Sequence, residues 1–331
     1  MSAEAGSRMA EAAAPRRRPW LLQEAVPVVL FLALAAVPFA AAAIGEPFYL
    51  SLVTRVMIFA IAALALDFVL GYGGMVSLGH AAFIGVGAYS VGILSHHGID
   101  SGLVQWPLGI ALSALAALVI GALSLKTRGV HFIMITLAFA QMLFYTATSL
   151  SDYGGDDGMT IWSRSTFPGL KLSDSGVFYW LVLGILLATY LLLRRVVASR
   201  FGRVLRGCKE NERRMLAIGF SPYRYKLTAF TISGALTGIA GLLMANHTEF
   251  VSPAYMAWVR SGDLIVMLVI GGLGTLHGAI LGAIAYLLLE EVLADLTQHW
   301  MVILGPIVIL VVLFAKGGLV RLVTPRRREE P

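Results

Sequence analysis

The chain has 331 residues, of which 58% are hydrophobic and 13% charged, and its formal net charge is +6. This composition, with a mean hydropathy of +0.81, excludes an ordinary soluble domain. Apolar runs of about 20 residues, the length a helix needs to cross a bilayer, recur along the chain. The composition therefore predicts an all-α polytopic membrane protein.

The basic residues gather at the two ends of the chain and in one central loop. In membrane proteins this pattern reports orientation, so we expect no nucleic-acid partner. We expect two cytoplasmic basic tails, at 1–24 and 317–331. The apolar run after Arg18 is longer than a usual signal core, which predicts an uncleaved first helix.

Between the tails we expect a transmembrane domain over 25–316 with about ten crossings, with a margin of about two. Continuous spans are predicted at 25–44, 50–70, 106–125, 130–150, 177–193 and 227–246, and a final helix at 300–315. The polar loop at 150–176 contains four aspartates and is expected outside the cell. A short apolar run at 264–270 is expected to turn back into an outward helix.

The basic loop at 194–226 is expected in the cytoplasm. Within it, "GRVLRGCKENERRMLAIG" has helical spacing and predicts one amphipathic helix that ends before Gly219 and Pro222. Its apolar positions are Val204, Leu205, Cys208, Met215, Leu216 and Ile218. Such a helix can lie on lipid headgroups or fit a groove on another protein, and the residues alone favour neither.

Two glycine-rich segments interrupt the apolar pattern: "GYGGMVSLGHAAFIGVGAYS" from residue 71 and "GGLGTLHGAILGAIAY" from residue 271. Aligning Gly73 with Gly271 also pairs Ser77 with Thr275, which predicts an internal repeat. Glycine lets helices approach closely and lets a helix unwind where backbone lines a cavity. Matching glycine-interrupted segments in two halves are typical of transporters.

Polar groups in the first segment favour a broken helix that lines a pathway. The glycines at 71–74 stand near Ser77 and His80, whose polar atoms need partners inside a membrane. For His80, a hydrogen bond to a neighbouring helix and contact with substrate both remain open. Gly85 and Gly87 lie on a plain apolar run, which is typical of helix packing.

Asp67 lies near the inner end of the second span, where a structural or capping role and a proton relay both remain possible interpretations. The sequence contains no phosphate-binding loop, no complete G-x-G-x-x-G, no H-E-x-x-H and no metal-ligand spacing. We therefore expect a chain that is not an enzyme, so that any motor for active transport lies elsewhere.

Five ordered motifs resemble a known family. They are "GYGGMVSLGHAAFIGVGAY", "TLAFAQML", "YGGDDGMT", "KENERRMLAIGFSPYRYKLTAF" and "LIVMLVIGGLGTLHGAILGAIAYLLLEE". Over 50–319 the chain is similar to the LivM-type membrane subunits of branched-chain amino acid ABC importers. The resemblance implies a bacterial inner-membrane permease that pairs with a second, related membrane subunit. It also implies two ATPase subunits that bind ATP and Mg²⁺, and an extracytoplasmic binding protein that delivers the substrate.

The resemblance also implies roles for particular residues. The segment 210–219 looks like the helix that docks on the ATPase, with coupling residues Glu210, Asn211, Glu212, Ala217 and Gly219. The glycine-rich segments look like pathway-facing broken helices, with pathway residues Gly73, Gly74, Ser77, Gly79, His80, Gly271, Gly272 and Thr275. The chain departs from the common family pattern at Arg213, Arg214, His277 and Ala279.

The expected substrates are leucine, isoleucine and valine, because small apolar pathway residues suit aliphatic side chains. Importers of urea and other amides belong to the same family and form the first alternative. A stand-alone carrier coupled to protons through Asp67 and His80 is the second alternative. An intramembrane enzyme built on His80 and Ser77 is the third.

Overall fold

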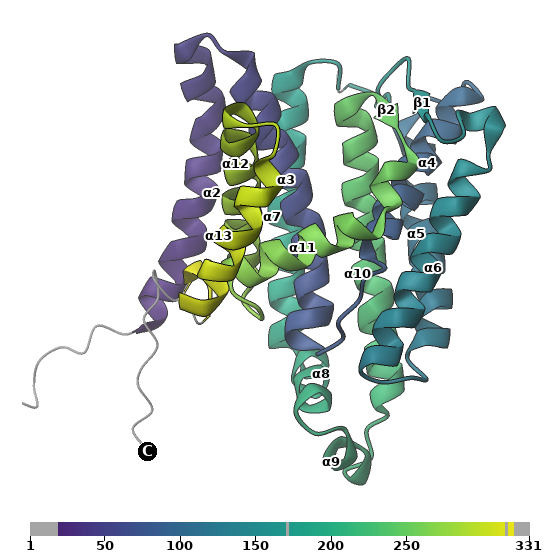
Figure 1. Ribbon diagram of the computed structural model, residues 1–331, viewed down its shortest axis with the longest axis vertical. Helices are drawn as coiled ribbons and strands as arrows, with labels where there is room; N and C mark the ends of the chain where they lie inside the picture. Colours follow the sequence, from purple (N-terminus) through teal and green to yellow (C-terminus); the bar gives the residue numbers. More distant parts are fainter. Residues whose placement is uncertain (1–18, 170–171, 315–316, 321–331) are drawn as a thin grey trace, which may run out of the picture.

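The computed structural model describes residues 19–169, 172–314 and 317–320. Helices dominate this part of the chain, with only a two-stranded ribbon and short turns besides (Figure 1). The all-α class and the polytopic character are therefore confirmed. Most of the two basic tails lies outside the described residues.

Most of the long helices run up and down, while α11 lies across the bundle (Figure 1). α2 (Pro19–Ile44) leads into α3 (Pro47–Asp67), which continues into a π-helical turn at Phe68–Tyr72. A non-helical stretch at 73–79 separates this turn from α4 (His80–His96). The further helices are α5 (Gly102–Ser124), α6 (Val130–Thr148), α7 (Ser175–Ala198), α8 (Arg200–Glu210), α9 (Glu212–Ala217), α10 (Pro222–Thr248), α11 (Trp258–Gly271), α12 (Leu276–Leu296) and α13 (Trp300–Phe314).

The two ends of the bundle differ in what they carry (Figure 1). α8 and α9 protrude from one end, which we call the α9 end. The strands β1 (Met159–Thr160) and β2 (Phe250–Val251) lie at the opposite end, which we call the β end.

Among the described residues, six helices are long and apolar enough to cross a membrane. α11 and α12 add a seventh span if this pair, bent by 113°, is counted as one. The prediction of about ten crossings was loose, because it counted segments shorter than about 20 residues as crossings. α4 and α13 have only 17 and 15 residues.

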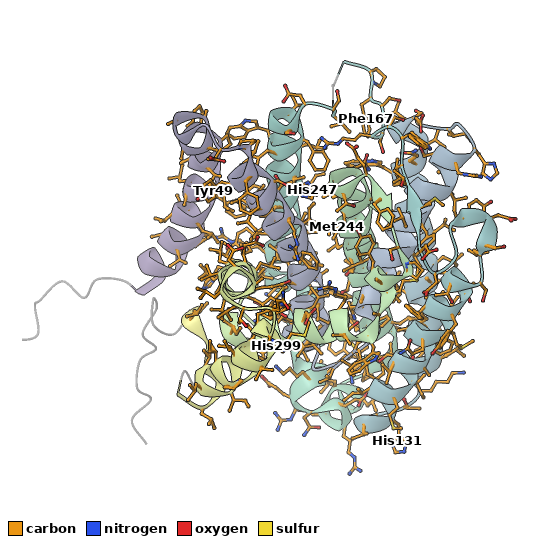
Figure 2. The ribbon with its side chains drawn as sticks, turned by 45° about the horizontal axis from the view of Figure 1, so that its top comes forward. Tyr49, His131, Phe167, Met244, His247 and His299 are labelled. Carbon is orange, nitrogen blue, oxygen red and sulfur yellow. The ribbon has the colours of Figure 1, made fainter. Side chains whose placement is uncertain are left out.

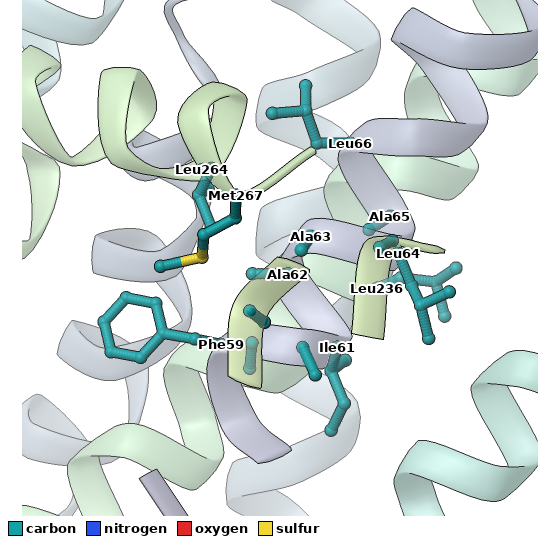
Figure 3. Packing of buried hydrophobic residues seen from close by; sticks show 14 of the residues in the cluster. Phe59, Ile61, Ala62, Ala63, Leu64, Ala65, Leu66, Leu236, Leu264 and Met267 are labelled. Atoms are coloured by element: carbon teal, nitrogen blue, oxygen red, sulfur yellow. The ribbon is translucent and has the colours of Figure 1, made fainter. Parts of the chain in front are cut away.

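α3 is the central helix of the bundle. It packs against α2, α7, α10, α11 and α12, and its second half, from Val56 to Asp67, is buried. The alternation of alanine and leucine in "IAALAL" at 61–66 lets neighbouring backbones approach while the leucines fill the gaps. Leu236 of α10 and Leu264 and Met267 of α11 lie around this stretch (Figure 3).

α4 and α10 pack closely because glycines lie at their contact. A Cβ on Gly87 would clash with the carbonyl oxygen of Gly238, and a Cβ on Gly241 would clash with that of Ile84. A Cβ on Gly85 would clash with the side chain of Met256. The packing interpretation of Gly85 and Gly87 is therefore confirmed.

The polar loop predicted at 150–176 is fastened to the β end of the bundle. β1 pairs with β2, which follows α10, in antiparallel register. Asn246 accepts a hydrogen bond from the backbone N–H of Ser165 at 2.7 Å, and Arg164 forms an ion pair with Glu249 at 2.9 Å. These contacts hold the loop over the end of α10.

α11 is longer than the apolar run at 264–270 predicts. It begins at Trp258 and includes Arg260 and Asp263. Because these two residues are charged, a search for apolar runs misses the first part of the helix. These two residues form an ion pair at 3.3 Å within the helix. The predicted turn from a short helix into a further helix is confirmed, because α12 follows after a short break.

Candidate functional site

The first glycine-rich break joins α3 to α4 and contains half of the candidate pathway residues. Gly73 is buried, and Gly74 has a φ of +68°, in the left-handed region that favours glycine. Ser77 is buried and accepts a hydrogen bond from the backbone N–H of Gly79 at 3.2 Å. A Cβ on Gly79 would lie 2.8 Å from the carbonyl oxygen of Thr136, so this stretch packs tightly against α6.

His80 begins α4 and is fully buried. Its Nε2 lies 2.9 Å from the Oγ of Ser233 on α10, and that hydroxyl donates to the carbonyl oxygen of Ala65 on α3. Its ring meets Phe83 and Phe230 edge to face. Of the two interpretations left open, this geometry matches a hydrogen bond to a neighbouring helix. The hydrogen bond of His80 goes to Ser233. An intramembrane enzyme would instead need His80 paired with Ser77.

The second break joins α11 to α12. Gly271 is buried, and a Cβ there would clash with the carbonyl oxygen of Gly278. Gly272 has a φ of +118°, which L side chains rarely adopt. Thr275 precedes α12, and its hydroxyl donates to the carbonyl oxygen of Gly272 at 2.7 Å. These contacts set the sharp angle between the two helices.

Asp67 connects the two breaks. It is fully buried at the end of α3, and its Oδ1 accepts a hydrogen bond from the backbone N–H of Gly274 at 2.8 Å. A Cβ on Gly71 would lie 2.5 Å from that same nitrogen. Only glycine at 71 allows the backbones of the two breaks to approach this closely. The geometry favours the structural interpretation of Asp67 over the proton relay, while the internal repeat stays a prediction.

The loop predicted as one amphipathic helix forms two helices, which corrects that expectation. Asn211 has extended backbone, with a φ of −153° and a ψ of 97°, and separates α8 from α9. Its side chain accepts a hydrogen bond from the N–H of Arg214 at 2.9 Å, which caps α9. The predicted end is confirmed: α9 ends at Ala217, and Gly219 follows with a φ of +89°.

The two helices separate the predicted apolar face into a buried and an exposed part. Val204, Cys208 and Met215 form a small buried cluster. Burial raises the pKa of the Cys208 thiol above its usual range, which keeps it protonated. The large side chains of Leu216, Ile218 and Phe220 are instead 54%, 61% and 37% exposed. We call these three residues the docking patch, because a group of exposed apolar side chains is a candidate contact surface for another protein.

Glu212 anchors α9 against two other segments. It forms ion pairs with Arg128, in the α5–α6 turn, at 3.4 Å and with Lys226 of α10 at 3.6 Å. A cavity of about 490 Å³ at the α9 end lies between these segments, and Gly73, Gly74 and Glu212 all line it. The structure therefore brings together residues that the sequence assigns to the pathway and to coupling.

Lys209 makes the direct contact between the coupling loop and the first break. Its Nζ donates to the carbonyl oxygen of Gly71 at 2.6 Å, and its methylene groups lie against Gly74. The guanidinium of Arg206 lies 5.3 Å from the ring centre of Tyr72, a cation–π contact. A charged hydrogen bond and a ring contact thus join α8 to the π-helical turn that follows α3.

Sequence reasoning missed Lys209, Arg206 and Gly274. Lys209 and Arg206 lie in a predicted amphipathic helix, where charged residues are typical of a face exposed to solvent. Their partners, in the π-helical turn after α3, lie far away in the sequence. Gly274 lies in the quoted glycine-rich segment, but its amide contact with Asp67 has no sequence signal. Ser77, Gly79, His80, Gly271 and Gly272 are packed between helices rather than exposed to a described cavity.

Comparison with known proteins identifies the family of the chain. A family model for the permease component of branched-chain amino acid transport systems matches residues 48–315. The chain belongs to this family. Membership identifies a membrane component of a transport system rather than an enzyme, in agreement with the apolar helices and the motifs in the two breaks.

Relatives of this permease include transport proteins from several bacteria. The permease protein LivM of the high-affinity branched-chain amino acid transport system of Salmonella typhimurium is 31% identical, covering 86% of this chain and 74% of that protein. LivM of Escherichia coli is 30% identical with the same coverage. The permease protein LsrC of the autoinducer 2 import system of an Enterobacter species is 27% identical, covering 86% and 84%. No solved structure matches this chain.

Proposed function

We propose that this chain is the permease subunit of an ATP-driven importer of leucine, isoleucine and valine. A second, related membrane subunit completes the translocation pathway. Two ATPase subunits bind ATP and Mg²⁺, and an extracytoplasmic binding protein delivers the amino acid. Support comes from the family membership and from the names of the LivM relatives. The E. coli relative LivH, 22% identical over 68% of this chain, illustrates that one organism carries two related permeases.

The single observation that carries the mechanism is the bond from Lys209 to Gly71. The docking patch lies a few residues beyond Lys209 and is exposed for a partner. A partner that moves α8 and α9 therefore displaces a group bonded to the first break, and Asp67 bonds the end of α3 to the second break. ATP drives transport in this scheme because it binds the two arrangements of the complex with different affinities.

We place the protein in the bacterial inner membrane with the α9 end and both termini in the cytoplasm. The loop at 194–226 is rich in arginine and lysine, whereas the loop at 150–176 contains four aspartates. Basic loops are retained on the cytoplasmic side, which supports this orientation. The β end then faces the binding protein.

The test is to purify the tagged chain from its native membrane in mild detergent and identify the proteins that accompany it. We expect a second permease and two ATPases, with ATP hydrolysis by the preparation. Reconstituted with the binding protein, the complex is expected to import leucine only when ATP is present. Recovery of a lone, ATP-inert chain, under conditions that preserve a control complex, would overturn the proposal.

The alternatives make different predictions in the same assay. A proton-coupled carrier would import leucine without ATP and would need Asp67 and His80 within reach of the substrate. Both side chains are instead fully buried and bonded to neighbouring segments. An amide importer of the same family would take up urea, and excess urea would then inhibit uptake.

A further inference from the structure

A cavity of about 230 Å³ lies between α3, α4, α10 and the start of α11. We call it the vestibule. It holds the volume of about seven water molecules, enough for one small solute. Its lining includes Arg55, Phe59, Met244, Thr248, Tyr255 and Arg260. Met244, which Figure 2 labels, belongs to the α10 wall.

Two arginines in this position are costly and so need a reason. Arg55 lies about 12 Å along α3 from its start at Pro47, at a rise of 1.5 Å per residue. Ionisable groups at such depth are expensive and mark substrate or ion pathways. The side chains of Arg55 and Arg260 are 31% and 41% exposed, so their guanidinium groups are not sealed within the protein.

Carboxylates behind the vestibule form ion pairs with the two arginines. Arg55 pairs with Glu290 at 3.4 Å and with Glu291 at 4.0 Å. Arg260 pairs with Asp263 at 3.3 Å, and the hydroxyl of Tyr286 donates to Asp263 at 2.9 Å. None of these carboxylates lines the vestibule. The two guanidinium groups are therefore the charged groups on the cavity surface, and three carboxylates lie behind them.

The other walls offer an apolar face and a pair of hydroxyl groups. Phe59 and Met244 are 9% and 7% exposed and belong to the buried core. Thr248 and Tyr255 lie with their hydroxyl oxygens 3.2 Å apart. Guanidinium groups bind carboxylates through two parallel hydrogen bonds, while hydroxyl oxygens accept from an ammonium group. One small cavity thus contains partners for all three parts of an aliphatic amino acid.

A smaller cavity of about 90 Å³ adjoins the vestibule and extends toward the β end. His247 lines both cavities (Figure 2). On α3, Ser51 and Thr54 line the smaller cavity, while Arg55 and Phe59 line the vestibule. These positions lie on one helix face. The polar face of α3 therefore leads from the β end to the two arginines.

We infer that the vestibule is a subsite for the carboxylate of an aliphatic amino acid. Arg260 and Arg55 bind the carboxylate, the hydroxyl oxygens of Thr248 and Tyr255 accept from the ammonium group, and the side chain lies against Phe59 and Met244. This inference rests on the proposed function and deepens it. A neutral amide such as urea brings no negative charge to compensate for the desolvation of two guanidinium groups, so the subsite selects amino acids over amides.

The test measures equilibrium binding of radiolabelled L-leucine to the purified full complex without the binding protein. We expect the wild-type complex to bind leucine and to bind L-leucinamide, which lacks the carboxylate, at least about tenfold more weakly. Arg260→Gln is expected to weaken leucine binding by at least about tenfold, because it removes a charged two-point contact. Arg260→Lys keeps the charge but loses the planar fork of the guanidinium, so we expect it to weaken leucine binding too. It replaces the Gln variant in the test if that variant does not assemble.

Asp263→Asn is the matched control. It removes the same Arg260–Asp263 ion pair but leaves the guanidinium in the vestibule, and Asn still accepts from Tyr286. We expect this variant to bind leucine within about twofold of wild type. Equal losses in Arg260→Gln and Asp263→Asn would overturn the subsite, since the pair would then be structural. Equal affinity for leucine and leucinamide, or unchanged binding in Arg260→Gln, would overturn it as well.

The uptake assay distinguishes failure of this inference from failure of the proposed function. If the wild-type complex imports leucine with ATP and the binding protein, but Arg260→Gln binds leucine as tightly as wild type, only the subsite is overturned. A wild-type complex that imports no leucine overturns the proposed function itself.

Discussion

The contact between Lys209 and Gly71 supports the sharpest prediction. Lys209→Met keeps an unbranched side chain against Gly74 and removes the ammonium that donates to the Gly71 carbonyl at 2.6 Å. Hydrogen bonds to charged groups contribute about 1.5–3 kcal/mol, and the partial exposure of Lys209 places this one at the lower end. A loss of about 1–2 kcal/mol corresponds to a factor of about 5–30 in an equilibrium between two arrangements.

We therefore expect Lys209→Met to lower the amount of leucine transported per ATP hydrolysed by about 5- to 30-fold. ATP hydrolysis itself should persist, because the docking patch is unchanged. The assay is simultaneous measurement of leucine uptake and phosphate release in proteoliposomes that contain the complex and binding protein. Assembly is checked by size-exclusion chromatography of each variant.

Lys126→Met is the matched control for this prediction. Lys126 lines the same cavity at the α9 end but makes no hydrogen bond or ion pair with the described part of the chain. We expect it to transport leucine with the wild-type ratio to ATP. Wild-type coupling in Lys209→Met would refute the mechanical reasoning. Equal impairment of both variants would refute it too, because loss of positive charge in the cavity would then be sufficient.

Four further substitutions and one control test other parts of the structure. Glu212→Ala and Gly219→Arg should leave the protein inserted but uncouple ATP hydrolysis from uptake, because they alter the ion pairs of α9 and a glycine with a φ of +89°. Asp67→Asn should retain uptake, since an amide oxygen still accepts from the second break. Gly87→Val should destabilise the protein by about 1–3 kcal/mol in thermal unfolding, because its side chain meets a backbone carbonyl of α10. Gly184→Ala should not destabilise it.

Each of these has an outcome that would contradict it. Unchanged uptake in both coupling-loop variants would remove 210–219 from the docking surface. Abolished uptake in Asp67→Asn, with normal assembly, would instead point to the proton-coupled carrier. Equal stability of Gly87→Val and wild type would mean that α4 and α10 do not approach as closely as the structure has them.

Much of the architecture follows from the sequence because it depends on local chemistry. A continuous apolar run such as 106–125 has one stable form in a membrane, a helix that satisfies its own backbone. The glycine clusters at 71–74 and 271–274 predicted interruptions of that form, and the two breaks lie there, at 73–79 and 272–275. The positions at which α9 ends and α10 begins follow from Gly219 and Pro222, whose preferences are intrinsic to the residues.

The tertiary structure alone decided which polar groups meet. Asn211 divides the coupling loop because its backbone N–H donates to a carbonyl oxygen in the last turn of α8, while its side chain caps α9. Helical spacing in the sequence does not reveal this division. Asp67 meets an amide 207 positions away, and Lys209 meets a carbonyl 138 positions away. Sequence determines that these charges need partners inside a low-dielectric bundle. Only the packing of α3 against α11 and α12, and of α8 against the π-helical turn that follows α3, brings a particular partner within reach. Hydrogen bonds act over about 3 Å, so the fold sets which groups can form them.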